Sequence, residues 1–139
     1  MGIILEMLNR QYIRSKLKKD GNYVKNLYRE WMTGEEYERY VAIRIETEWK
    51  AQRVTLTKGS GDFGADIIGI DSSGRSFCVQ CKKFARPVGV KAVQEVIGAR
   101  IYYKCQFAYV VTNNTFTQGA IDLARQAGVI LCPLVRGTI

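Results

Sequence analysis

The spacing of hydrophobic residues divides the first part of the chain into two helical segments. Apolar residues recur every three or four positions over residues 5–32, with a break predicted at Gly21-Asn22. A new helix is predicted to begin after Thr33 and to run to about Lys50, because Thr33-Gly-Glu-Glu36 is a capping box. The pattern alone does not assign a role to the first segment.

Downstream of Lys50 the hydrophobic pattern switches several times between the periods of strands and helices. Alternating or continuous apolar runs of four to eight residues are typical of strands, and a spacing of three or four is typical of helices. A glycine-rich loop over 58–65 and a turn at Ser72-Ser73-Gly74 separate the first three strands. The predicted strands are 52–57, 66–70, 75–82, 107–112 and 129–132, and the predicted helices are 90–103 and 116–126.

This order of elements predicts an α/β domain at residues 33–139, preceded by a helical extension at residues 1–32. The turn makes an antiparallel hairpin, whereas strands that alternate with helices in the second half imply parallel neighbours. We therefore expect a mixed central sheet flanked by helices. A chain of 139 residues is long enough for one hydrophobic core and too short for two.

The hairpin is predicted to bring three polar side chains to one end of a strand pair. With a three-residue loop at Ser72–Gly74, Asp66 falls opposite Gln80 on one face of the sheet. Lys82 lies two residues further along the same face. A loop of two or four residues, or a bulge, would change this placement.

The three side chains suit metal-assisted attack on a phosphodiester. Asp66 supplies a hard carboxylate oxygen for a divalent cation, and Gln80 offers an amide oxygen, a weaker ligand. Lys82 would place its ammonium beside the scissile phosphate and the attacking water. Taken singly, Asp66 is explained as a loop-capping carboxylate and Lys82 as a solvated strand end, so the hypothesis depends on the three together.

A fourth candidate, Glu38, lies on the apolar side of the predicted second helix. It shares a face with Val41, Ala42 and Ile45, three, four and seven residues further on. Burying a carboxylate without a partner is costly, so a nearby metal site would explain its position. We therefore add Glu38 to the candidate site.

The net charge of +8 is concentrated in two parts of the chain. Residues 1–32 carry seven basic and three acidic side chains, and residues 58–104 carry eight and four. A basic surface attracts nucleic-acid phosphates, although a solubility role explains the charge equally well. Four basic residues near the polar trio are candidates for phosphate contacts: Lys58, Lys83, Arg86 and Lys91.

Residue types that are absent or isolated exclude several other kinds of site. The chain has no histidine, which rules out His-based nucleases, Ser-His-Asp and Cys-His hydrolases, and His-ligated zinc. Cys78 and Cys81 are predicted to point to opposite faces of a strand, so reduced, buried cysteines are favoured over zinc. No apolar run is long enough for a membrane span, and no signal peptide is evident, which favours a cytoplasmic protein without a membrane partner.

Six short motifs follow one another between Thr33 and about Leu131: Gly34-Glu-Glu-Tyr-Glu38, Gly59-Ser-Gly-Asp-Phe-Gly-Ala-Asp66, Val79-Gln-Cys-Lys82, Pro87-Val-Gly-Val90, Val111-Thr-Asn113 and Phe116-Thr-Gln-Gly-Ala120. Each motif is weak alone. In this order and spacing they resemble the Mrr-like branch of the PD-(D/E)xK nucleases, which is found in modification-dependent restriction systems.

The resemblance implies a restriction-endonuclease-like αβββαβ core, cleavage of DNA that depends on Mg²⁺ (with Mn²⁺ as an alternative), and a homodimer. At the matching positions Asp66, Gln80 and Lys82 form the active site, and Glu38 assists. The general class has Asp or Glu where this chain has Gln80. The Mrr-like branch shares this departure, which leaves the number of metal ions open.

The leading hypothesis is a metal-dependent endodeoxyribonuclease with a role in restriction or defence. One alternative is a nuclease that resolves DNA junctions, although such enzymes usually have an acidic residue at the position of Gln80. Another is a DNA-binding module without catalysis, against which the presence of both Asp66 and Lys82 counts. Cleavage of plasmid DNA separates the three.

Overall fold

The computed structural model describes residues 32–57 and 63–134. Residues 1–31 of the predicted N-terminal extension and the candidate phosphate contact Lys58 lie outside the described residues. Within them the order of elements is α-β-β-β-α-β-α-β, as the hydrophobic pattern predicts. None of the helices described is both long enough and apolar enough to cross a membrane.

A five-stranded mixed sheet forms the centre of the domain. The strands lie side by side in chain order, with β2 paired antiparallel to both β1 and β3. The pairs β3–β4 and β4–β5 are parallel, which confirms the directions predicted from the helical connections. The strands are β1 (Arg53–Leu56), β2 (Ile67–Ile70), β3 (Ser76–Lys82), β4 (Phe107–Thr112) and β5 (Ile130–Pro133).

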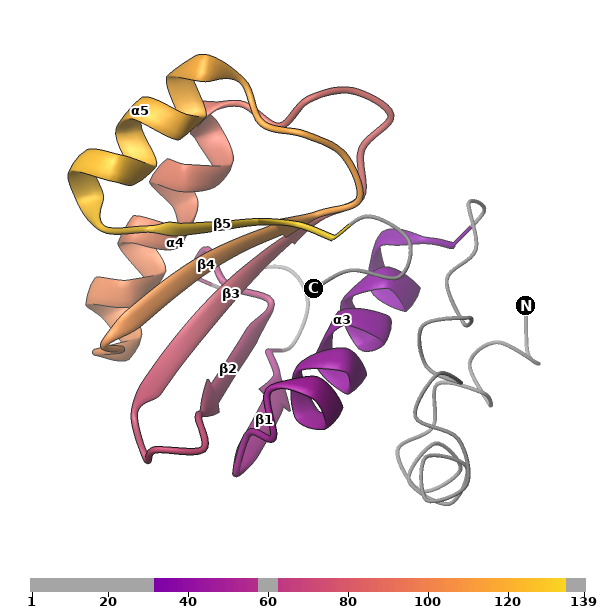
Figure 1. The fold of residues 1–139 in the computed structure, drawn as a ribbon, viewed down its shortest axis with the longest axis vertical. Helices are drawn as coiled ribbons and strands as arrows, with labels where there is room; N and C mark the ends of the chain where they lie inside the picture. Colours follow the sequence, from indigo (N-terminus) through magenta and orange to yellow (C-terminus); the bar gives the residue numbers. More distant parts are fainter. Residues whose placement is uncertain (1–31, 58–62, 135–139) are drawn as a thin grey trace.

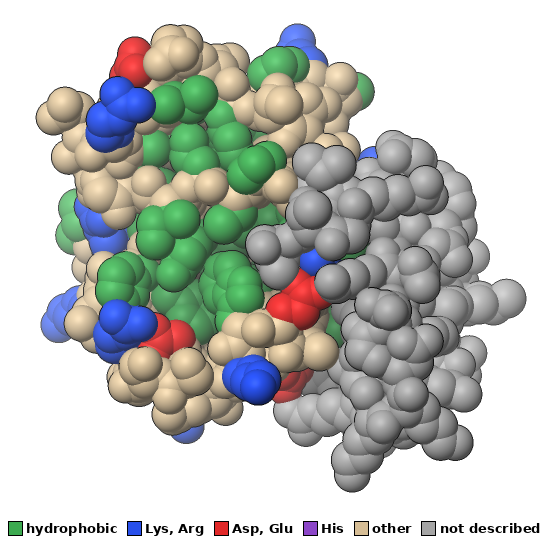
Figure 2. All heavy atoms as spheres, in the orientation of Figure 1, with side chains coloured by type: hydrophobic (Ala, Val, Ile, Leu, Met, Phe, Trp, Pro, Cys, Tyr) green, Lys and Arg blue, Asp and Glu red, His purple; other side chains and the backbone are tan. Residues whose placement is uncertain are grey.

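The helices cover the two faces of the sheet unequally. One face carries α3 (Gly34–Glu48), which packs on β1 and β3. The other carries α4 (Val90–Tyr103) and α5 (Gln118–Ala127), which contact each other and strands β3 to β5 (Figure 1). On the α3 side, hydrophobic side chains remain visible over the strands that the helix leaves open (Figure 2).

Two caps explain where helices begin. At the start of α3 the Thr33 hydroxyl accepts the Glu36 N–H at 3.1 Å, and the Glu36 carboxylate accepts the Thr33 N–H at 3.3 Å, which confirms the predicted capping box. The last helix begins at Gln118, later than the predicted Phe116. Thr117 is its N-cap and accepts the Ala120 N–H, while Phe116 forms an isolated bridge with Val88.

The core has two parts, one on each face of the sheet. Apolar residues of α3 pack against Phe77, Val79 and Cys81 of β3. Apolar residues of α4 and α5 pack against Cys78 of the same strand. The two cysteines therefore point to opposite faces, as their spacing predicts, and both are free thiols.

The hairpin of β2 and β3 has the predicted register. Ile67 pairs with Val79, and the same offset continues to Ile70 and Ser76. The loop closes through an Asp71 N–H bond to the Arg75 carbonyl at 2.8 Å, with Gly74 in the left-handed region at φ 84°. The three-residue turn on which the site prediction depends is therefore present.

Candidate active site

Asp66 lies immediately before β2, held by two bonds to β3. Its backbone N–H donates to the carbonyl of Val79 at 2.8 Å, although Val79 already pairs with Ile67. Two successive residues thus face one partner, which is the pattern of a β-bulge. The carboxylate Oδ2 accepts the Cys81 N–H at 2.8 Å and is largely buried, with the residue 8% exposed. The regular pairing of β2 with β3 ends at Ile67, one residue after Asp66. The Asp66 carboxylate turns toward the β3 backbone.

Gln80 lies in the C-terminal half of β3 and is 6% exposed. It lies two residues from Cys78, so strand alternation turns its side chain toward the α4 layer. Its side-chain oxygen Oε1 is buried and accepts no hydrogen bond. A buried oxygen without a donor costs on the order of 1–3 kcal/mol, so it needs an explanation.

Lys82 ends β3 and forms an ion pair with α4. Its ammonium lies 3.2 Å from the carboxylate of Glu95, with side chains 21% and 28% exposed. The same ammonium lies 5.8 Å from the centre of the Phe84 ring. Lys82 thus points to the face that Gln80 also uses, two residues along the strand.

The end of the glycine-rich loop rests on α4 beside this pair. Gly64, at φ +88°, lies so close to the Glu95 backbone that a Cβ there would collide with the Glu95 carbonyl oxygen. Only glycine fits this approach, because the site lacks both the space and the ordinary backbone conformation. One residue earlier, the ring of Phe63 stacks on Tyr102 with centroids 3.6 Å apart. Phe63 and Gly64, which precede Asp66, are therefore held against α4.

Glu38 lies on α3, which covers the face of the sheet opposite α4, and its charge acts on Cys81 of β3. Burial raises the pKa of the Cys81 thiol well above its usual value. The negative charges of Asp66 and Glu38 raise it further, while Lys82 opposes them. Both carboxylates and the ammonium therefore influence the Cys81 thiol, which points to the α3 face of the sheet.

The chain after β3 carries the candidate phosphate contacts. Arg86 and Lys91 are exposed, and Lys83 is half-buried. Asn113, at the end of β4, fixes this segment, because its side chain accepts the Phe84 N–H at 2.7 Å and donates to the Phe84 carbonyl at 3.0 Å. Asn113 thus fixes the backbone that follows Lys82, while the side chains of Arg86 and Lys91 remain exposed to solvent.

The family model described as Mrr_cat, restriction endonuclease, matches residues 29–136. The chain belongs to this family. No match is found among curated proteins.

Solved nuclease structures share the restriction-endonuclease-like fold. A repair endonuclease from Pyrococcus abyssi is 18% identical with a TM-score of 0.51, over 79% of this chain and 50% of its own. EndoMS in complex with double-stranded DNA is 20% identical with a TM-score of 0.52, over 78% and 47%. The DNA modification-dependent restriction endonuclease AspBHI is 22% identical with a TM-score of 0.51, over 94% and 32%. The chain spans half or less of the length of these proteins.

In this domain few of the described side chains at the candidate site offer oxygen atoms that could bind a metal ion. The described residues hold no group of three or more cysteine and acidic side chains arranged around a metal. Two oxygen donors could serve a cation: the buried carboxylate of Asp66 and the buried, unpaired Oε1 of Gln80. Both are hard oxygen donors, which fit Mg²⁺ or Mn²⁺.

Sequence reasoning assigned no role to two residues that shape the site, Glu95 and Asn113. Glu95 is the one acidic residue of the predicted helix 90–103, and it shares a face with the buried Ala92 and Ala99 at three and four residues. The argument that selected Glu38 would have selected it too. Asn113 ends the quoted motif Val111-Thr-Asn113, but that motif does not reveal its partner Phe84, which lies 29 residues away.

Proposed function

We propose that the chain is the catalytic part of a metal-dependent endodeoxyribonuclease that hydrolyses DNA phosphodiester bonds, in restriction or defence. The observation that carries the proposal is the buried Oε1 of Gln80, which lacks a donor beside a fixed carboxylate and an ion-paired lysine. Buried side-chain oxygens are usually hydrogen-bonded in native proteins, so an unpaired one calls for a reason. In a nuclease fold, a buried oxygen without a hydrogen-bond donor is suited to bind a metal ion.

Asp66 and Gln80 would hold the cation, Mg²⁺ or Mn²⁺. When bound beside a phosphate, such an ion lowers the pKa of water and offsets charge on the phosphate oxygens. The Cys81 N–H keeps the Asp66 carboxylate in one orientation, so the site needs little rearrangement to receive a ligand.

Lys82 would place a positive charge beside the scissile phosphate. Its ammonium is held at the end of β3 and remains partly exposed, as contact with a polyanion requires. Glu38 would act from α3, where its charge acts on Cys81 of β3. We assign it an assisting role in ordering polar groups around the site.

DNA is the proposed partner, and the basic residues around the site support it. Lys83, Arg86 and Lys91 would contact phosphates, with Lys58 as a fourth, and the net charge of +8 would favour association. We also propose a cytoplasmic homodimer in which residues 33–139 form the catalytic domain and residues 1–32 an extension. Recognition of a sequence or modification would belong to a further domain.

Plasmid cleavage tests the proposal. Purified protein with Mg²⁺ or Mn²⁺ is expected to nick or linearise supercoiled DNA, and Asp66→Ala or Lys82→Ala is expected to reduce the rate about a hundredfold or more. Asp122→Ala and Arg125→Ala on α5 are matched charge controls that should keep the wild-type rate. Circular dichroism checks that every variant is folded.

The same assay separates the alternatives. Methylated and unmethylated plasmid are compared, because a modification-dependent restriction enzyme distinguishes them. Intact plasmid with every metal, while DNA is still bound, would support a binding module and overturn the proposal. A strong preference for four-way junctions over linear duplex would support junction resolution. Full activity in Lys82→Ala would overturn the site assignment.

A further inference from the structure

Helix α4 meets both halves of the candidate site at one residue, Glu95. The Glu95 carboxylate lies 3.2 Å from the ammonium of Lys82 at the end of β3. The Glu95 backbone carbonyl is the atom against which Gly64 packs, two residues before Asp66. A single helical position therefore contacts the strand that carries the lysine and the loop that carries the carboxylate.

We propose that Glu95 is a positioning residue that holds the Lys82 ammonium in the orientation needed for phosphodiester cleavage. The inference deepens the proposed function and rests on it. Glu95 would act through Lys82, with no direct contact to the reacting atoms.

The charges around Lys82 explain why the position needs an acidic residue. Gln80, the neighbour on the same strand face, is neutral, and one oxygen of Asp66 is engaged by the Cys81 N–H. Lysine carries its charge on four rotatable carbons, so without a partner its ammonium samples many positions. Among the described residues, Glu95 is the carboxylate within ion-pair distance of it.

The ion pair is unsuited to a purely stabilising role. Both side chains are about one-quarter exposed, and pairs in contact with solvent contribute little to folding stability. Placement of a charge is different, because small displacements of a catalytic group have large effects on rate. The backbone of Glu95 is held in place, because Ala92, Val96 and Ala99 of α4 are buried in the core.

Two substitutions test the inference. Glu95→Gln keeps the size of the side chain and removes its charge, and Glu95→Asp keeps the charge on a shorter stem. We expect Glu95→Gln to lower kcat about 10- to 100-fold with little change in KM, as supporting residues of active sites generally do. Glu95→Asp should recover part of the loss. Asp122→Asn on α5 makes the same change in net charge at an exposed site and should keep the wild-type rate.

A second readout does not depend on cleavage. In metal-free protein labelled with ¹³C at lysine, a held Lys82 gives two distinct signals for its ε-methylene protons. These signals should merge in Glu95→Gln and remain separate in Asp122→Asn, with exposed Lys91 as an averaged reference in every sample. If wild-type protein does not cut DNA, the proposed function fails, whereas this comparison still decides whether Glu95 holds Lys82.

The results that would overturn the inference are specific. A wild-type kcat in Glu95→Gln would show that Lys82 needs no such partner. A rise in KM at constant kcat would assign Glu95 to DNA binding instead. Merged Lys82 signals in the wild-type protein would show that the ion pair does not restrain the side chain in solution.

Discussion

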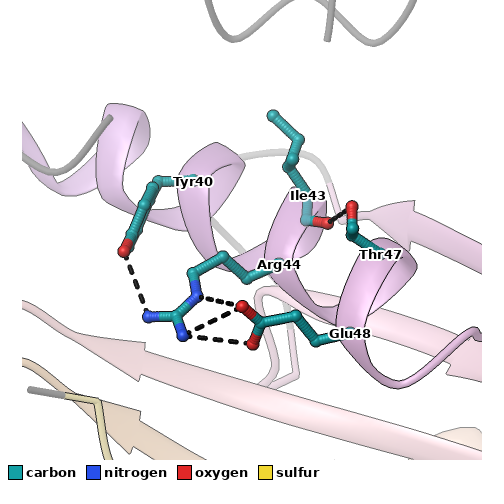
Figure 3. Close-up of polar contacts among 5 residues, drawn as sticks. All are labelled: Tyr40, Ile43, Arg44, Thr47 and Glu48. Atoms are coloured by element: carbon teal, nitrogen blue, oxygen red, sulfur yellow. Dashed lines mark hydrogen bonds and ion pairs between the residues drawn. The ribbon is translucent and has the colours of Figure 1, made fainter. Parts of the chain in front are cut away.

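Two clusters of charged and polar side chains in this domain differ in whether they complete their own hydrogen bonds. The first lies on α3, where the fully buried guanidinium of Arg44 bonds the Tyr40 hydroxyl at 3.1 Å (Figure 3). The same guanidinium makes three contacts with the Glu48 carboxylate, at 3.1 to 3.3 Å. Tyr40, Arg44 and Glu48 follow one another at intervals of four positions on one helix, so the backbone alone brings them together.

The second cluster is the candidate active site. It is assembled from α4, β3 and the segment before β2, and it leaves Gln80 Oε1 buried without a donor. Lys82 and Glu95 pair across elements and stay in contact with solvent.

The difference distinguishes a structural cluster from the proposed active site. A buried charge stabilises a fold when every polar group around it is satisfied, as for Arg44. A buried polar group without a hydrogen bond destabilises the ligand-free protein, and it can contribute to binding when a ligand pairs with it. The two clusters should therefore respond in opposite ways to loss of a polar group.

The largest effect on stability is expected from Arg44→Ala. Removing the guanidinium leaves the mostly buried Glu48 carboxylate without its partner, which should lower the free energy of unfolding by about 3 kcal/mol. Urea unfolding followed by circular dichroism measures the change. Cleavage by the fraction that stays folded at low temperature should be unaffected.

The control removes both charges. Arg44→Met with Glu48→Gln leaves no unpaired charge and should cost clearly less than Arg44→Ala alone. Equal losses in the two proteins would mean that packing of the arginine stem, and not the ion pair, accounts for the stability.

A smaller and opposite effect is expected from Gln80→Leu. The change keeps the volume and removes the unpaired oxygen, so the free energy of unfolding should stay level or rise by about 1 kcal/mol. Plasmid cleavage should fall, and the increase in Tm that Mg²⁺ gives the wild-type protein should shrink. Differential scanning calorimetry with and without Mg²⁺ measures both stability terms.

Gln80→Glu is the matched control, because it keeps the size and adds a charge. It should destabilise the metal-free protein and increase the shift in Tm that Mg²⁺ produces. A loss of stability in Gln80→Leu equal to that in Gln80→Glu would contradict the idea that Oε1 lacks a partner.

The fold was predictable because its signals are local. The capping box at Thr33, the alternating residues of β1 and the glycine in the Ser72–Gly74 turn each act within a few positions, and each is confirmed. The start of α5 was misplaced by two residues, because the bridge between Phe116 and Val88 depends on a contact distant in sequence.

The site was predictable only along the hairpin. Strand alternation placed Gln80 and Lys82 on one face from the sequence, but the predicted pairing of Asp66 with Gln80 does not form, because the ladder ends at Ile67 and Val79. The bulge-type bond of Asp66 to Val79 and the ion pair of Lys82 with Glu95 could not be predicted from the sequence. The bulge joins two neighbouring strands, whereas the ion pair depends on how α4 packs on the sheet.

The smallest effect on stability is expected from the exposed ion pair of α3, Glu35 with Arg39, which serves as a reference for the buried pair of Arg44 with Glu48. Arg39 and Glu35 have the same four-residue spacing as Arg44 and Glu48, with a bond of 2.9 Å, yet their side chains are 35% and 72% exposed. Water screens the pair, so Glu35→Gln should lower the free energy of unfolding by only about 0.3–0.5 kcal/mol. Urea unfolding in low salt and in 1 M NaCl measures it, and the difference should vanish in high salt. A loss as large as that of Arg44→Ala would mean that helix spacing, and not burial with complete hydrogen bonding, sets the strength of these clusters.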